Sequence, residues 1–71
     1  MKEYKLPEVL RKLLDENKMS YSDLADKICL SERPIGEWLA DRGRPSLMSL
    51  MSLAWAFDVS IDYLVYGEDE E

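Results

Sequence analysis

Residues Met19 to Leu39, MSYSDLADKICLSERPIGEWL, decide the fold of this chain, because they predict two short helices joined by a tight turn. Ser20 precedes the first helix and Asp23 follows three residues later, which is the spacing of a capping box. Ser31 stands in the capping position before the second helix. Each helix has one apolar face, formed by Leu24, Ala25 and Ile28 in the first and by Ile35, Trp38 and Leu39 in the second.

The turn between these helices is short, since only a few residues separate Ile28 from Ser31. The two helices must therefore cross at a steep angle, and the small side chain of Ala25 allows the close approach that such a crossing needs. This arrangement is a helix-turn-helix. Cys29 lies at the turn, where the backbone favours glycine. A lone cysteine in a chain without histidine is expected to fill a small space in the core.

The surrounding segments extend the pattern over nearly the whole chain, and together they resemble the Cro/cI-like, phage-repressor type of helix-turn-helix domain of bacterial and phage regulators. The matching segments are LPEVLRKLLDENKMSYSDLADKI, LSERPIGEWL, RGRPSLMSLMSLAWAFDVS and IDYLVYG. The resemblance implies an all-α, compact five-helix bundle of the lambda-repressor type, with the motif in its second and third helices. It also implies a transcriptional regulator that binds double-stranded DNA as a dimer on a pseudo-palindromic operator.

The resemblance assigns DNA contacts to individual residues of this chain. Those expected to touch bases in the major groove lie on the third helix: Ser31, Glu32, Arg33 and Glu37. Phosphate contacts are expected from Ser20, Tyr21, Arg42 and Arg44. Arg33 is the best base reader, because its guanidinium can bond guanine O6 and N7 together. The end of the fold, where the family commonly forms its two-fold contact, offers Trp55, Tyr63 and Tyr66.

Several of these residues have a second interpretation. Tyr21 stands where the family usually has glutamine, and its ring can instead cover the junction of the first two helices. The loop arginines can simply be solvated, and the aromatic residues near the end can complete a small core. The acidic residues Glu32 and Glu37 are unusual on a helix that approaches phosphates, because they can accept hydrogen bonds only from cytosine N4.

We expect five helices, with caps at Ser46 and Ser60 for the last two: Pro7 to Asn17, Tyr21 to Ile28, Glu32 to Ala40, Ser46 to Phe57 and Ser60 to Gly67. After the third helix, Asp41 or Gly43 is expected to take the left-handed conformation. The fourth helix has apolar residues at helical spacing that predict a core stripe of Leu47, Leu50, Met51, Ala54 and Phe57. Three further apolar residues do not fit this stripe, namely Met48, Leu53 and Trp55.

Length and composition indicate one domain, residues 1–67, followed by an acidic tail, residues 68–71, which we expect to be disordered. The net charge is −6, and four of the 15 acidic residues are in this tail, which leaves nine basic against eleven acidic residues in the domain. No apolar run is long enough to span a membrane, and no signal peptide is apparent. We therefore expect a cytoplasmic protein without a membrane partner.

Two other classes of function compete with DNA binding. The acidic third helix and the negative net charge favour a protein-interaction module on the same fold, such as an antitoxin, an anti-repressor or an inhibitor with a protein partner. An enzyme is not expected, because the chain has no histidine, no Gly-rich phosphate loop after a strand and no paired carboxylates in a pocket. One cysteine without histidine also predicts no metal site, and no cofactor is expected.

Overall fold

The computed structural model describes residues 2–68, which form five α-helices and no strand. The helices are α1 (Leu6–Glu16), α2 (Tyr21–Ile28), α3 (Glu32–Leu39), α4 (Leu47–Phe57) and α5 (Ile61–Tyr66). The predicted all-α fold with five helices is confirmed, and the predicted bounds differ by no more than about one residue, which is the usual uncertainty of helix ends. Of the predicted acidic tail, residues 69–71 lie outside the described residues.

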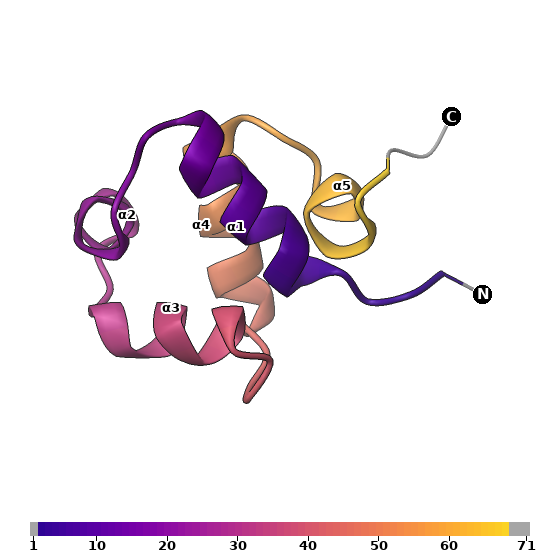
Figure 1. Ribbon diagram of the computed structural model, residues 1–71, viewed down its shortest axis with the longest axis horizontal. Coiled ribbons are helices and arrows are strands. Elements are labelled where there is room, and N and C mark those ends of the chain that lie inside the picture. The colour runs from indigo at the N-terminus through magenta and orange to yellow at the C-terminus, as the bar shows by residue number, and fades with distance from the viewer. Residues whose placement is uncertain (1, 69–71) are drawn as a thin grey trace.

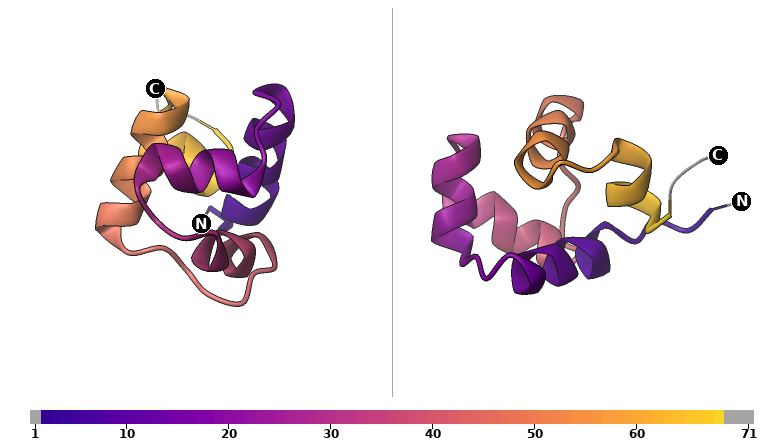
Figure 2. Two further views of the ribbon diagram at one scale, coloured as in Figure 1. Left: turned by 90° about the vertical axis from the view of Figure 1, so that its left-hand side faces the viewer. Right: turned by 90° about the horizontal axis from the view of Figure 1, so that it is seen from above.

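The buried hydrophobic side chains form one core cluster, and Figure 1 shows how the five helices are arranged. Seen from the side and from above, α1 and α4 lie on opposite sides of the molecule, with α2 and α3 at one end and α5 at the other (Figure 2). Contacts run from α1 to α3 and α5, from α2 to α3 and α4, and from α4 to α5. Within residues 2–68, no helix is long and apolar enough to cross a membrane.

Every helix contributes at least one completely buried side chain to the core. These side chains are Leu6 and Leu10 of α1, Leu24 of α2, Ile35 of α3, Leu53 of α4 and Leu64 of α5. Full burial of an aliphatic side chain of this size stabilises the folded state by about 1.5–3 kcal/mol. Because all five helices contribute buried side chains to the same core, the position of each helix depends on the others.

The turn between α2 and α3 has the predicted geometry. The Ser20 hydroxyl accepts a hydrogen bond from the Asp23 backbone N–H at 3.1 Å, and the Ser20 N–H donates to the Asp23 carboxylate at 3.0 Å, which completes the capping box. Ala25 is buried at the crossing, and its carbonyl accepts the Leu30 N–H at 2.9 Å. Cys29 ends α2 in the left-handed conformation, with φ of 60°.

Two expectations about this motif are wrong. Cys29 is exposed rather than a core filler, because the left-handed turn that ends α2 directs it outward. Ser31 occupies the predicted capping position with an extended backbone, but its side chain makes no capping hydrogen bond. The side chains of Ser20, Ser46 and Ser60 do cap α2, α4 and α5.

The core face of α4 differs from the predicted stripe. Leu53 is completely buried although it does not fit that stripe, whereas Leu47 and Met51 of the stripe are exposed. The other three predicted residues, Leu50, Ala54 and Phe57, do pack against the core. The error has a physical cause: α4 contains only apolar residues and serines, so its sequence lacks the charged face that would fix its rotation.

Both ends of the described chain pack on the α5 side of the bundle. The Lys5 N–H donates a hydrogen bond of 2.6 Å to the Val65 carbonyl, so the segment before α1 runs alongside α5. Gly67 ends α5 with φ of 80°, and a Cβ added there would lie 3.5 Å from Val9. Asp41 takes the left-handed conformation after α3, with φ of 58°, as one of the two predicted residues for that position.

Candidate nucleic-acid interface

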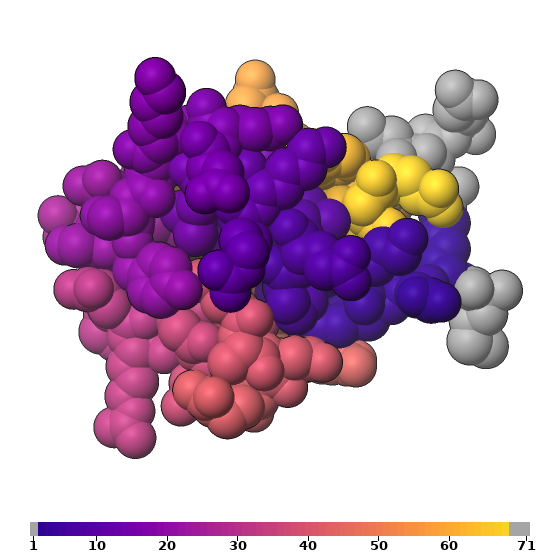
Figure 3. Space-filling view, in the orientation of Figure 1, coloured from indigo at the N-terminus to yellow at the C-terminus, as the bar shows by residue number. Residues whose placement is uncertain are grey.

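The exposed N-terminal end of α3 brings together three of the predicted base-contacting residues, Ser31, Glu32 and Arg33, all of them exposed to solvent. The opposite face of the same helix is buried through Ile35, Trp38 and Leu39. In the view of Figure 3, α3 and the loop that follows it form the lower edge of the molecule, beside the broad surface of α1. The buried face therefore fixes the position of α3 against the core, while the side chains of its first turn remain exposed to solvent.

Glu37 and Arg42 form an ion pair, although they were predicted to touch different parts of DNA. Arg42 Nε lies 2.6 Å from Glu37 Oε2, and both side chains are partly or largely exposed. The backbone explains the pairing: with Asp41 in the left-handed conformation, the Arg42 N–H donates to the Glu37 carbonyl at 2.9 Å. The pair offsets one of the two negative charges on the outer side of α3 and holds Arg42 beside that helix.

Arg44 stacks on the ring of Tyr4, with its guanidinium carbon 4.0 Å from the ring centroid. This contact joins the segment before α1 to the loop after α3. The Tyr4 hydroxyl is buried and has no hydrogen-bond partner among the described residues. Its burial raises the pKa of Tyr4, an effect that the nearby Arg44 charge opposes and that Asp41 reinforces. Tyr4 thus fixes the predicted phosphate ligand Arg44 from one side.

The N-terminal end of α2 carries the other predicted phosphate contacts, Ser20 and Tyr21, both exposed. They line a surface hollow of about 450 Å³ together with Glu32 of α3 and Arg11 of α1. The Ser20 hydroxyl accepts the Asp23 N–H in the capping box. The hydrogen bond from the Ser20 backbone N–H to the Asp23 carboxylate, with a smaller contribution from the Ser20 side chain, lowers the pKa of Asp23. An ionised carboxylate thus sits where the helix N-terminus attracts anions.

Two residues of this region were not found from the sequence. Arg11 adds a positive charge beside the starts of α2 and α3, and Tyr4 supports Arg44. No local pattern could have identified either one, because Arg11 is one of several charged residues on the outer side of α1. Tyr4 reaches Arg44 only when the chain is folded, since 39 residues separate them in the sequence.

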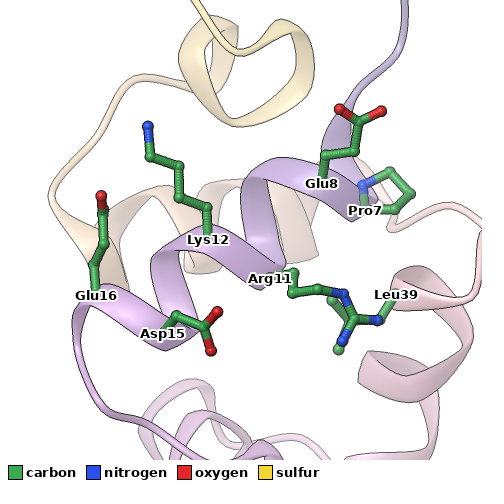
Figure 4. Close-up of a pocket in the computed structure, with 7 residues that line it drawn as sticks. All are labelled: Pro7, Glu8, Arg11, Lys12, Asp15, Glu16 and Leu39. Carbon is green, nitrogen blue, oxygen red and sulfur yellow. The ribbon is translucent and has the colours of Figure 1, made fainter.

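A second hollow, of about 500 Å³, lies between the outer side of α1 and the end of α3 (Figure 4). It is lined by six residues of α1 and by Leu39, toward which the Arg11 side chain extends. Its carboxylates and basic groups alternate along one exposed helix face, an arrangement that favours a solvated surface. Among residues 2–68 there is no group of three histidine, cysteine or carboxylate side chains that could hold a metal ion.

The structure does not bring the three predicted dimer residues together. Trp55 is exposed on α4, and Lys27 of α2 places its Nζ 5.9 Å from the Trp55 ring. Tyr63 is partly buried against the core, and Tyr66 has Lys2 Nζ 5.3 Å from its ring. Because α2 and α5 lie at opposite ends of the molecule, Trp55 belongs to a different surface from the two tyrosines (Figure 1).

Comparison with known proteins identifies this arrangement. A family model described as helix-turn-helix matches residues 10–64, which span all or part of every helix. The chain belongs to the Cro/cI-like helix-turn-helix family. This family of transcriptional regulators uses the motif that α2 and α3 form here, so the resemblance seen in the sequence is confirmed.

The relatives of this helix-turn-helix protein include named regulators. It is 36% identical over 61 residues to the uncharacterized HTH-type transcriptional regulator YobD of Bacillus subtilis (strain 168), covering 86% of this chain and 54% of YobD. It is 31% identical over 62 residues to the HTH-type transcriptional activator BcrR of Enterococcus faecalis, covering 87% of this chain and 30% of BcrR. The chain thus spans about half of one relative and less than a third of the other.

A solved structure shares the fold. The crystal structure of a transcriptional regulator from Listeria innocua superposes with a TM-score of 0.83 at 26% identity, covering 97% of this chain and 64% of that one. The similarity therefore includes all five helices and not only the motif.

Proposed function

We propose that this helix-turn-helix protein acts in the cytoplasm as a sequence-specific transcriptional regulator that binds a pseudo-palindromic DNA site as a homodimer. The observation that carries the proposal is the contrast between the two sides of α3. Ile35 and Trp38 anchor its inner side in the core, and Arg33 stands exposed on its first turn. A recognition helix in the major groove contacts base edges with its N-terminal residues, which is the free part of α3.

In this proposal Arg33 reads a base through its two parallel hydrogen bonds, with Ser31 and Glu32 beside it. Arg42 and Arg44 bind phosphates on the flank, together with Ser20 and Tyr21 at the start of α2. The contact with Glu37 presets the Arg42 side chain, and the ring of Tyr4 does the same for Arg44. Side chains that are already held lose less conformational freedom when DNA binds.

In vitro selection from a random duplex library tests DNA binding and identifies the site in one experiment. On the selected site, Arg33→Ala should weaken binding by about 1–3 kcal/mol and relax the preference at one base position. Lys12→Ala is the matched control, because it removes one positive charge from an exposed position of α1 on the α5 side. If Arg33→Ala binds the selected site as tightly as Lys12→Ala does, Arg33 does not read the site.

A second candidate function is a protein-interaction module on the same fold. It is favoured by the net charge of −6 and by Glu32, an exposed acid on the first turn of α3. Gel shifts at low and rising salt separate the two functions. DNA binding through phosphate contacts weakens steeply as salt is added, because releasing counterions into a more concentrated salt solution is less favourable. Absence of duplex binding at every salt concentration, together with a protein that co-purifies, would support the interaction module.

A further inference from the structure

The outer side of α4 is unlike any other helix surface of this protein. α4 is the one helix among the five without a charged residue. Four large apolar side chains are exposed on it: Leu47 at 66%, Met48 at 71%, Met51 at 50% and Trp55 at 69%. Their spacing of i, i+1, i+4 and i+8 places them within about 100° around the helix axis, opposite the buried Leu53. We call these four residues the α4 outer face.

A helix that is apolar on all sides is normally buried on all sides. The core of this protein covers only the inner half of α4, through Leu53 and Ala56. Contiguous apolar patches of about 300–600 Å² are the largest on typical monomers and are often functional. The α4 outer face is therefore a surface that another molecule is expected to cover.

Charge indicates which molecule this is. The chain carries a net charge of −6, so two copies repel each other across most of their surfaces. The α4 outer face has no charge of its own. At its edge the positively charged Lys27 lies beside the Trp55 ring. The nearest acidic residue along the chain is Asp58, which caps the end of α4, so a second copy can approach the rest of this face without bringing carboxylates together. A two-fold contact uses the same patch on both molecules, which suits a patch made of one kind of side chain.

We propose that the α4 outer face is the contact between two copies of this chain. The inference rests on the homodimer proposed above and assigns its interface to α4 instead of to Tyr63 and Tyr66 of α5. Trp55 is the one predicted dimer residue that this interface includes. Aromatic residues and methionine are enriched in interfaces of this kind, and tryptophan is a common energetic centre.

The area of the face sets the strength of the contact. Large side chains present on the order of 200 Å² each when fully exposed, so the four exposed fractions correspond to roughly 500 Å² per copy. Stable interfaces bury about 800 Å² per partner. The dimer is therefore weak in free solution, with a dissociation constant in the micromolar range, and two adjacent half-sites on DNA would reinforce it by holding both copies together.

Sedimentation equilibrium without DNA tests the interface directly. The wild-type chain should pass from monomer to dimer as its concentration rises through the micromolar range. Met51→Glu should raise the dissociation constant at least about tenfold, because it places a carboxylate in an uncharged contact. Ser22→Glu is the matched control, since it adds the same charge at an exposed position of α2 near α1 and α3 and should dimerise like the wild type.

Further variants make the outcome decisive. Trp55→Glu should act like Met51→Glu, whereas Tyr66→Ala should leave the dissociation constant unchanged. Because Met51 and Trp55 are exposed, both variants should keep the wild-type circular dichroism spectrum and unfolding midpoint. The proposal is overturned if the wild type stays monomeric throughout, or if Tyr66→Ala prevents dimerisation while Met51→Glu and Trp55→Glu do not.

A DNA measurement separates this proposal from that of DNA binding. Met51→Glu should retain wild-type affinity for a single half-site, because α3 is unchanged, and should lose affinity on the full two-fold site. Failure of the wild type to bind any half-site would count against DNA recognition and leave the sedimentation result standing. Equal loss of affinity on half-sites and full sites would count against the α4 contact.

Discussion

Within residues 2–68, four residues other than glycine adopt the left-handed backbone conformation: Lys18, Cys29, Asp41 and Asp58, with φ between 53° and 60°. They follow the ends of α1 to α4, and only α5 ends at a glycine, Gly67. A side chain in this conformation costs roughly 1–2 kcal/mol because its Cβ approaches the following carbonyl. The protein therefore retains backbone strain after four of its five helices, and a substitution by glycine relieves that strain at the substituted position.

Cys29→Gly should stabilise the protein by about 0.5–1 kcal/mol, since glycine adopts positive φ without a steric cost and the exposed thiol contributes no core packing. Part of the gain is lost because glycine also increases the entropy of the unfolded chain. Urea unfolding of the two proteins measures the difference. Cys29→Ala is the control, because it removes the thiol and keeps the strain. A glycine variant no more stable than the alanine variant would show that the φ of Cys29 costs nothing.

At the level of the helices, the capping box of α2 makes the stability of that helix depend on pH. The Ser20 N–H donates to the Asp23 carboxylate, which lowers the pKa of Asp23 in the folded protein. A carboxyl group with a lowered folded pKa stabilises the protein fully above its unfolded pKa of about 3.9. That stabilisation is lost as the pH falls through the folded pKa.

Asp23→Asn should therefore be less stable than the wild type near neutral pH, and the gap should narrow as the pH is lowered below about 4. Chemical unfolding of both proteins over this pH range measures the gap. Ser20→Ala removes the other half of the capping box and should reduce the same acid-dependent part of the stability. A gap that stays constant from neutral to acidic pH would mean that the ionised form of Asp23 does not support the cap.

The helices also show which features could be predicted from the sequence and why other features could not. The α2–turn–α3 motif was predictable because each of its helices has one apolar face and charged residues on the other side. The Ser20–Asp23 spacing is also a local signal of a capping box. The rotation of α4 was not, since a helix of apolar residues and serines is compatible with several inner faces. The Glu37–Arg42 pair depends on the turn at Asp41, and the stacking of Arg44 depends on residues far away in the chain.

Across the whole molecule, the distribution of charge matters more than its sum. Three of the four arginines, Arg33, Arg42 and Arg44, lie on α3 or in the loop that follows it, in a chain whose net charge is −6. Glu68, which begins the acidic run at the end of the sequence, follows α5 at the opposite end of the fold. The same segment also carries Glu32, Glu37 and Asp41, so its charges cancel while the rest of the chain is acidic. A polyanion is therefore repelled least when it approaches α3.

The salt dependence of DNA binding should report the number of phosphate contacts. With Arg42 and Arg44 on each of two copies, the logarithm of the binding constant should fall with the logarithm of salt concentration with a slope of about −4. Arg44→Gln should reduce the magnitude of that slope by about 2. Fluorescence anisotropy on the selected duplex at several salt concentrations measures it, with Lys12→Gln as the charge-matched control. An unchanged slope for Arg44→Gln would remove Arg44 from the phosphate contacts.

The hydrogen bond from the Lys5 N–H to the Val65 carbonyl ties the beginning of the bundle to its last helix. Both ends of the described chain consequently leave the fold on the α5 side, remote from the turn between α2 and α3 (Figure 1). Any cargo attached at either end, such as a fluorescent reporter or an affinity tag, is carried behind the recognition helix and not in front of it. The same proximity means that a short peptide could close the chain into a ring without bending any helix.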